Sequence, residues 1–135
     1  METQHVNLNF SQEFAGNLQT KLGEFPIGSQ PGDLLPYDMV LGALGSCFYA
    51  TFLGIAEKMR LEYEKVEIDI RGAKRQEVPT TLEWVEVKLD FYGVAPKQDN
   101  KFARAVDLAG QYCSVHEMIA QVAKITTTYE LHPQA

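Results

Sequence analysis

Residues 39–56 read MVLGALGSCFYATFLGIA, eighteen positions without a charged side chain. Pro36 suits the first turn of a helix, and Asp38 suits the positive end of a helix dipole. Charged residues return at Glu57, Lys58 and Arg60, which mark a solvated end. We therefore predict one long helix that begins near Pro36 and runs to Arg60.

This apolar stretch is long enough to be weighed as a membrane span, which needs about 17–25 apolar residues. It contains three glycines, and strand-like segments on both sides need an apolar surface to pack on. We therefore interpret it as a buried central helix and predict no association with a membrane. Residues 1–15 lack the basic start and apolar run of a signal peptide, so the expected location is cytoplasmic.

Four small residues recur at every fourth position of this helix: Gly42, Ser46, Ala50 and Gly54. Residues four apart lie on one face of a helix, so another backbone can approach closely there. One interpretation is tight packing against the protein's own sheet, and the other is a helix–helix contact across a dimer interface. A helix that is apolar on all sides is buried on all sides, which favours a dimer for a chain of this size.

The rest of the chain alternates between strand and helix patterns. Period-two alternation predicts strands over residues 5–10, 66–71, 82–91 and 124–131, with residues 14–22 completing an N-terminal hairpin. Residues 25–33 are dense in turn formers and are predicted to be a loop. Helices are expected over residues 96–110 and from about Cys113 onward. Only one β–α–β unit occurs, so we predict an α+β fold in a single domain over residues 1–135.

The composition excludes several classes of protein. The chain has 135 residues, a hydrophobic content of 45% and a net charge of −6, which are ordinary values for one globular domain. Disordered, collagen-like and disulfide-rich proteins are excluded. The acidic balance also argues against nucleic acid as a partner, because that interaction needs a basic face.

The two cysteines are the main candidates for chemistry. Cys47 lies in the middle of the long helix among neutral neighbours, whereas Cys113 is expected at a helix start, where free N–H groups stabilise a thiolate. His116 follows three residues later and is placed to reach the Cys113 sulfur. We therefore expect Cys113 to have the lower pKa. Two alternatives are inert buried thiols and a zinc site of Cys47, Cys113 and His116, with water or His132 as the fourth ligand.

Two motifs resemble those of a known family. Leu41-Gly-Ala-Leu-Gly-Ser-Cys47-Phe, after Pro36-Tyr-Asp-Met, resembles the first cysteine motif of the OsmC/Ohr family, the osmotically inducible and organic hydroperoxide resistance proteins. Cys113-Ser-Val-His116 resembles its second motif. The order of predicted elements matches over essentially the whole chain, and the match is better to the broad OsmC-like branch.

The resemblance implies an intertwined homodimer in which long cysteine helices pack at the centre beneath antiparallel sheets. It implies a thiol peroxidase in which Cys47 attacks a hydroperoxide and Cys113 resolves the resulting sulfenic acid as a disulfide. An external dithiol, such as a lipoylated or thioredoxin-type protein, would then reduce the disulfide. This chemistry needs no metal or organic cofactor.

The family activates the first cysteine with an arginine from the N-terminal strands and a glutamate near the helix start. Here no arginine precedes Arg60, and Tyr37 falls at the position of the glutamate, with Asp38 beside it as the nearest carboxylate. The other cations considered for this role are Lys21, Arg71, Lys74 and Arg75.

Two functions follow as hypotheses. The first is a cysteine-based organic hydroperoxide reductase in stress defence. The second is an OsmC-like homodimer without efficient peroxidase activity, which binds an apolar small molecule or electrophile in the cleft between subunits. The missing arginine and the apolar surface of the central helix motivate the second hypothesis.

Overall fold

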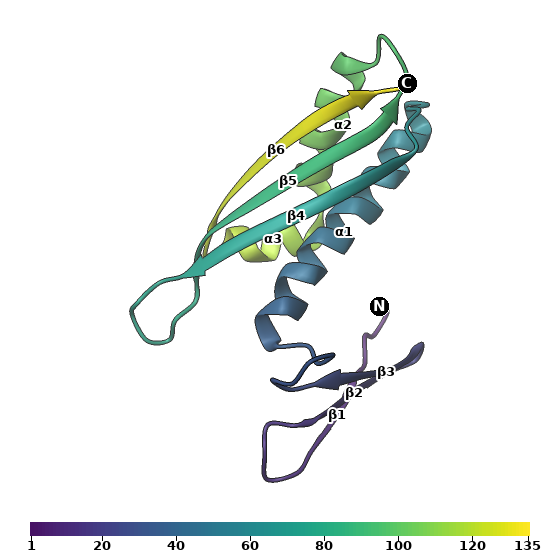
Figure 1. Ribbon diagram of the computed structural model, residues 1–135. Coiled ribbons are helices and arrows are strands. Elements are labelled where there is room, and N and C mark those ends of the chain that lie inside the picture. Colours follow the sequence, from purple (N-terminus) through teal and green to yellow (C-terminus); the bar gives the residue numbers. More distant parts are fainter. The chain divides into compact units, whose positions relative to one another are not determined.

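The computed structural model describes residues 1–135 and has the predicted α+β class, with two three-stranded sheets and three helices. The chain forms two compact units, residues 1–40 and residues 41–135. The long helix α1, Pro36–Lys58, begins in the first unit and continues in the second (Figure 1). Its bounds confirm the helix predicted from the uncharged stretch.

The first unit is an antiparallel sheet in the order β1-β2-β3. Its strands are β1, Asn7–Phe10, β2, Gly16–Thr20, and β3, Gly23–Ile27. The prediction of a loop from Phe25 onward was therefore wrong for the first three residues. Pro26 is tolerated because β3 is an edge strand, where a missing N–H need not break a ladder. The Pro26 carbonyl accepts a hydrogen bond from the Leu34 N–H at 2.9 Å, which closes the following loop.

Little of this first sheet is buried. Ile27 is the buried hydrophobic residue of the unit, whereas many large apolar side chains are exposed. The exposed ones include Leu8, Phe10, Phe14 and Phe25. A three-stranded sheet needs a covered hydrophobic face to be stable, so this unit requires a packing partner.

The second unit has a sheet in the order β4-β5-β6, built from β4, Lys65–Lys74, β5, Leu82–Val94, and β6, Lys124–Pro133. The pair β4–β5 is antiparallel as predicted, but β5 and β6 run parallel. The expectation of a purely antiparallel sheet was therefore wrong. The cause is the crossover from β5 to β6, since residues 95–123 carry the chain back to the starting end of the sheet.

The helices of the second unit lie on one face of this sheet (Figure 1). The crossover contains α2, Asp99–Tyr112, and α3, Ser114–Ala120. The side chain of Gln98, just before α2, forms two hydrogen bonds with the backbone of the segment that connects α1 to β4. Its amide nitrogen donates to the Arg60 carbonyl at 3.2 Å, and its oxygen accepts from the Glu62 N–H at 2.9 Å.

An aromatic cluster holds α1, α2 and the sheet together. The Phe52 ring lies 5.0 Å from that of Phe91 on β5 and 6.4 Å from that of Phe102 on α2, measured between centroids. Tyr63 contacts the same rings, and its hydroxyl is 2.8 Å from that of Tyr49. Burial and the hydrogen bond with Tyr49 raise the pKa of Tyr63. The cluster is the centre of the hydrophobic core.

The stripe of small residues on α1 does not face the sheet of the second unit. Leu44, Gly45, Phe48 and Phe52 are buried, and a Cβ atom at Gly45 would lie 2.8 Å from Ile70 Cδ1. The stripe of Gly42, Ser46, Ala50 and Gly54 is exposed. A Cβ atom at Gly42 or Gly54 would meet nothing within 4 Å. Packing of this stripe against the β4-β5-β6 sheet is therefore excluded, and the helix–helix interpretation remains.

By length and composition, α1 is the one helix in the structure that could cross a membrane. The side chains of Leu44, Phe48 and Phe52 nevertheless lie fully buried in the core of the second unit. This placement favours the interpretation of α1 as a core helix.

We expect the substitution Phe52→Ala to lower the free energy of unfolding by about 3–5 kcal/mol, because it empties the centre of the aromatic cluster. Urea denaturation followed by circular dichroism measures this change. Val78→Ala is the control, since Val78 is 90% exposed and its truncation leaves the core intact. Equal stability of the two variants would contradict the assignment of the core.

Candidate active site

Cys47 lies on α1 next to the start of α3. Its side chain is partly exposed, and its Sγ lies 3.8 Å from the Ser114 Oγ. The core-facing neighbour Phe48 fixes the rotation of the helix, so that the sulfur is directed toward α3 rather than into the core. The two residues are 67 positions apart in the sequence, and only the packing of α1 beside the crossover brings them together.

Cys113 caps α3. It is fully buried, and its Sγ accepts a hydrogen bond from the His116 backbone N–H at 3.4 Å. Its own N–H donates to the Ala109 carbonyl at 2.9 Å, which ties it to the end of α2. The predicted helix start at Cys113 is confirmed. The partner from His116 is the backbone N–H, where we had expected the imidazole ring.

The two thiols differ in acidity, in the order opposite to our expectation. A hydrogen bond from the Val115 backbone N–H lowers the pKa of Cys47, and smaller contributions come from the Cys113 thiol and from Ser114. Burial raises the pKa of Cys113, and the neighbouring Cys47 sulfur raises it further. The prediction failed because the N–H groups at the start of α3 serve both sulfurs, and Cys113 is the one excluded from water.

The site therefore pairs a partly exposed thiol whose pKa is lowered with a buried neighbouring thiol whose pKa is raised. Nucleophilic cysteines need partial exposure and a stabilised thiolate, and a neighbouring thiol allows an oxidised sulfur to be resolved as a disulfide. These are the features of a two-cysteine redox site.

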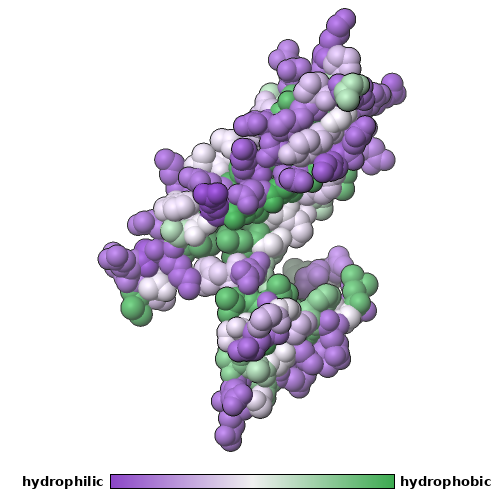
Figure 2. Space-filling view, in the orientation of Figure 1, coloured by the Kyte–Doolittle hydropathy of each residue, from purple (hydrophilic) through white to green (hydrophobic).

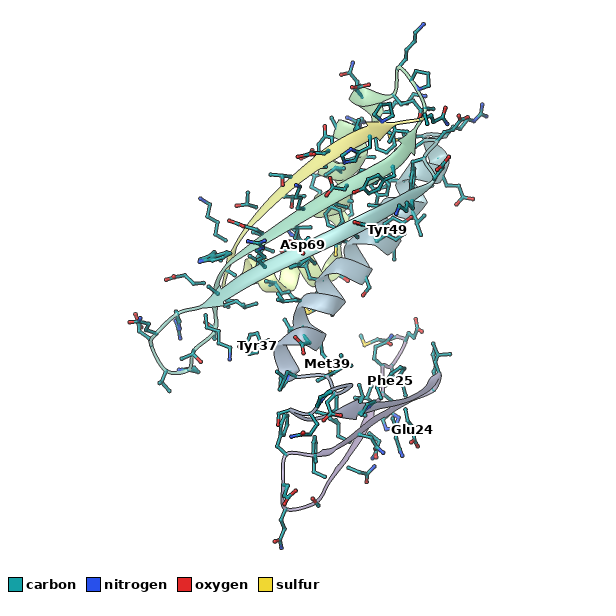
Figure 3. All side chains as sticks on the ribbon, in the orientation of Figure 1. Glu24, Phe25, Tyr37, Met39, Tyr49 and Asp69 are labelled. Atoms are coloured by element: carbon teal, nitrogen blue, oxygen red, sulfur yellow. The ribbon has the colours of Figure 1, made fainter.

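Tyr37 and Asp38 lie in the first turn of α1, within the first unit. Tyr37 is labelled in Figure 3. The Asp38 Oδ2 accepts a hydrogen bond from the Leu35 N–H at 3.0 Å. A carboxylate at the third helical position that binds the capping residue's N–H stabilises the helix start. The structure thus gives Asp38 a helix-capping contact. The predicted supporting role of Tyr37 and Asp38 toward Cys47 stays a prediction.

Arg71 and Arg75, two of the cations considered as activators of Cys47, contact other groups. The Arg71 Nε lies 3.6 Å from the Asp69 carboxylate, and both side chains are exposed. The Arg75 Nε donates to the Pro79 carbonyl at 3.0 Å in the loop between β4 and β5. The pKa of Cys47 is lowered by hydrogen bonds rather than by one of these charges.

His132 does not join the cysteines, so it is not the fourth ligand of the predicted zinc site. Its ring is stacked on Tyr92, and its Nε2 lies 2.9 Å from the Asp90 Oδ1. The three-residue group with metal-ligand spacing is Asp90, Glu130 and His132, without a sulfur. The geometry does not favour the zinc alternative at the cysteines.

Sequence reasoning did not single out Ser114 and Val115. Both belong to the motif Cys113-Ser-Val-His116, but Val115 acts through its backbone, and no side-chain pattern reports that role. The available signal was their position after a predicted helix cap, because the first N–H groups of a helix have no partner within it.

Comparison with known proteins agrees with this fold. The family model described as OsmC-like protein matches residues 29–128. A curated relative, protein YhfA of Escherichia coli K12, is 33% identical over 121 residues, covering 83% of this chain and 90% of its own length. The chain belongs to the OsmC-like family, as its two cysteine motifs predicted.

Solved structures show the same fold. A hypothetical protein from Aquifex aeolicus superposes with a TM-score of 0.88 at 27% identity, over 100% of both chains. The organic hydroperoxide resistance protein OhrB of Bacillus subtilis superposes with a TM-score of 0.71 at 15% identity, over 96% of this chain and 98% of its own. The second comparison is evidence for the fold alone.

We expect the substitution Val115→Pro to slow alkylation of Cys47 by iodoacetamide at pH 7 by at least about threefold, since the thiolate reacts and its main hydrogen-bond donor is removed. Val115→Ala keeps the N–H and should react like the wild type. Peptide mass spectrometry measures the rate at Cys47, and far-ultraviolet circular dichroism verifies the fold. Equal rates in both variants would contradict the assigned donor.

Proposed function

We propose that this protein is a thiol-dependent peroxidase that reduces organic hydroperoxides, with Cys47 as the peroxidatic residue and Cys113 as the resolving residue. The observation that carries the proposal is the lowered pKa of a partly exposed Cys47 thiol beside a second sulfur. Family membership and the resemblance of the fold to organic hydroperoxide resistance proteins support a redox role in stress defence.

In the first step, the Cys47 thiolate attacks one oxygen of the hydroperoxide, ROOH. The O–O bond breaks, its electron pair leaves with the alkoxide, and a proton from solvent completes the alcohol ROH. Cys47 is thereby oxidised by two electrons to a sulfenic acid. The Val115 N–H stabilises the negative charge on the attacking sulfur before the step.

In the second step, the Cys113 sulfur attacks the Cys47 sulfenic acid, a disulfide forms and water leaves. Cys113 must lose its proton in this step, and the hydroxyl group of the sulfenic acid takes it up. An external dithiol of the lipoyl or thioredoxin type then reduces the disulfide by exchange, and the cycle returns to two thiols. The cycle requires no metal or organic cofactor, and we place it in the cytoplasm.

The functional form is proposed to be a homodimer in which each chain is one OsmC-like domain of residues 1–135. Two exposed apolar surfaces support this. One is the α1 stripe with its neighbour Leu53, and the other is the first sheet with Leu8, Phe10 and Phe25. Figure 2 shows hydrophobic residues gathered on the first unit and on the second. Burial of both surfaces against a second copy would provide the cover that the first sheet requires.

A second candidate function is binding of an apolar small molecule or electrophile between two such chains, without efficient peroxide turnover. The specific observation in its favour is that Cys47 is activated by neutral donors, and that no arginine precedes Arg60. A ligand that is retained through gentle purification and detected by native mass spectrometry would favour this function.

One equivalent of cumene hydroperoxide added to the reduced protein should remove both free thiols and lower the intact mass by about two hydrogens. Cys47→Ser should consume no peroxide. Cys113→Ser should stop at a Cys47 sulfenic acid that dimedone traps. Two free thiols in the wild type after several minutes would contradict the peroxidase and leave ligand binding as the better function.

Sedimentation velocity at micromolar concentration should give twice the chain mass for the wild type. Leu53→Asp places a charge beside the α1 stripe and should yield monomer, because an unpaired charge is costly to bury. Val122→Asp is the control, since Val122 is exposed in the turn between α3 and β6. A monomeric wild type would contradict the dimer.

A further inference from the structure

The outer face of the β4-β5-β6 sheet, which the helices leave uncovered, carries a row of three carboxylates. The register places Glu67 of β4 opposite Asp90 of β5, and Asp90 opposite Glu130 of β6. Like charges directly opposite each other on neighbouring strands are destabilising. Figure 2 shows this face as mostly hydrophilic, and Asp69, labelled in Figure 3, lies on it.

Lysines accompany the two outer carboxylates of this row. The Lys65 Nζ lies 3.5 Å from the Glu67 Oε1, and the Lys88 Nζ lies 3.6 Å from the Glu130 Oε1. Asp90, the central carboxylate and the least exposed of the three, has His132 as its partner. The His132 ring is held in place by stacking on Tyr92, with centroids 4.5 Å apart and planes 10° apart.

One nitrogen and two carboxylate oxygens converge at this point. The His132 Nε2 lies 2.9 Å from the Asp90 Oδ1 and 3.9 Å from the Glu130 Oε2. Glu130 contacts Lys88 through its other oxygen, Oε1, so the lysine leaves Oε2 available. All three ligand atoms lie within 4.8 Å of one another.

We propose that Asp90, Glu130 and His132 form a binding site for a divalent first-row transition metal ion such as Zn²⁺. Two ligand atoms each about 2.1 Å from zinc, at angles of about 90–109°, lie about 3.0–3.4 Å apart. The observed separations of 2.9 and 3.9 Å lie on either side of this range. The imidazole favours zinc over calcium or magnesium, which prefer oxygen ligands alone.

In the bound form, the metal ion would lie between the His132 Nε2 and the Asp90 Oδ1, and the neutral ring would carry its one proton on Nδ1, so that the Nε2 lone pair faces the ion. Water completes the coordination, since the Glu130 and His132 side chains are 59% and 39% exposed. The ion would join β5 to the edge strand β6 and neutralise the repulsion within the carboxylate row. The site lies on the face of the sheet opposite the helices, away from the cysteines, and does not depend on the peroxidase cycle.

Isothermal titration with Zn²⁺ tests the site in the Cys47→Ser/Cys113→Ser chain, which cannot bind zinc through sulfur. We expect one zinc ion per chain. His132→Phe keeps the stack on Tyr92 but loses the nitrogen, and Asp90→Asn weakens an oxygen ligand, so each should reduce the affinity at least about tenfold. Glu86→Gln, a carboxylate on the same face of β5, is the matched control and should bind as tightly as its parent.

Three results would overturn the metal site. The first is zinc binding by the wild type but not by the Cys47→Ser/Cys113→Ser chain, and the second is no zinc binding by either of these proteins. The third is an unchanged affinity for zinc in both the His132→Phe and the Asp90→Asn variants. Circular dichroism of each variant verifies that the sheet is intact. None of these outcomes depends on peroxide turnover, so the test is independent of the proposed peroxidase.

Discussion

The hydrogen bond from the Val115 N–H to the Cys47 sulfur depends on three elements that meet at one place. The core side of α1, with Phe48 and Phe52, fixes the rotation of the helix and directs Cys47 toward α3. The end of α2 holds Cys113 through the Ala109 carbonyl, which sets where α3 begins. Any change that turns α1 or shifts the start of α3 would separate a thiolate from its donor, so the core and the chemistry are coupled.

The same arrangement divides the roles of the two sulfurs. Both are close to the free N–H groups at the start of α3, but only Cys47 is partly exposed to water. Burial keeps Cys113 protonated, so it can donate a hydrogen bond toward Cys47 rather than compete with it. Hydrogen bonds lower the pKa of Cys47 and burial raises that of Cys113, so the two effects together separate the attacking thiol from the resolving thiol. This division would need no cation beside Cys47, which suits a chain without an arginine before Arg60.

Much of this could be predicted from the sequence, and the failures have physical causes. The uncharged stretch with its charged ends located α1, period-two alternation located the β4–β5 pair, and a helix-start signal near Cys113 located α3. Periodicity could not report that β6 runs parallel to β5, or that Pro26 lies in an edge strand, because both depend on non-local pairing. The lowered pKa of Cys47 was missed for the same reason, since its main donor, Val115, lies on α3, which begins 67 residues after Cys47, and acts through its backbone.

Hydrogen bonds to the Cys47 sulfur should make Cys47 the more acidic of the two thiols. The ultraviolet absorbance of thiolates, followed against pH in the reduced protein, measures the pKa of each thiol. We expect two separate transitions, one with a pKa below the ordinary thiol value and one with a pKa above it, and Cys47→Ser should remove the first. A single transition at the ordinary thiol pKa, or loss of the lower transition in Cys113→Ser while Cys47→Ser retains it, would contradict this order of acidity.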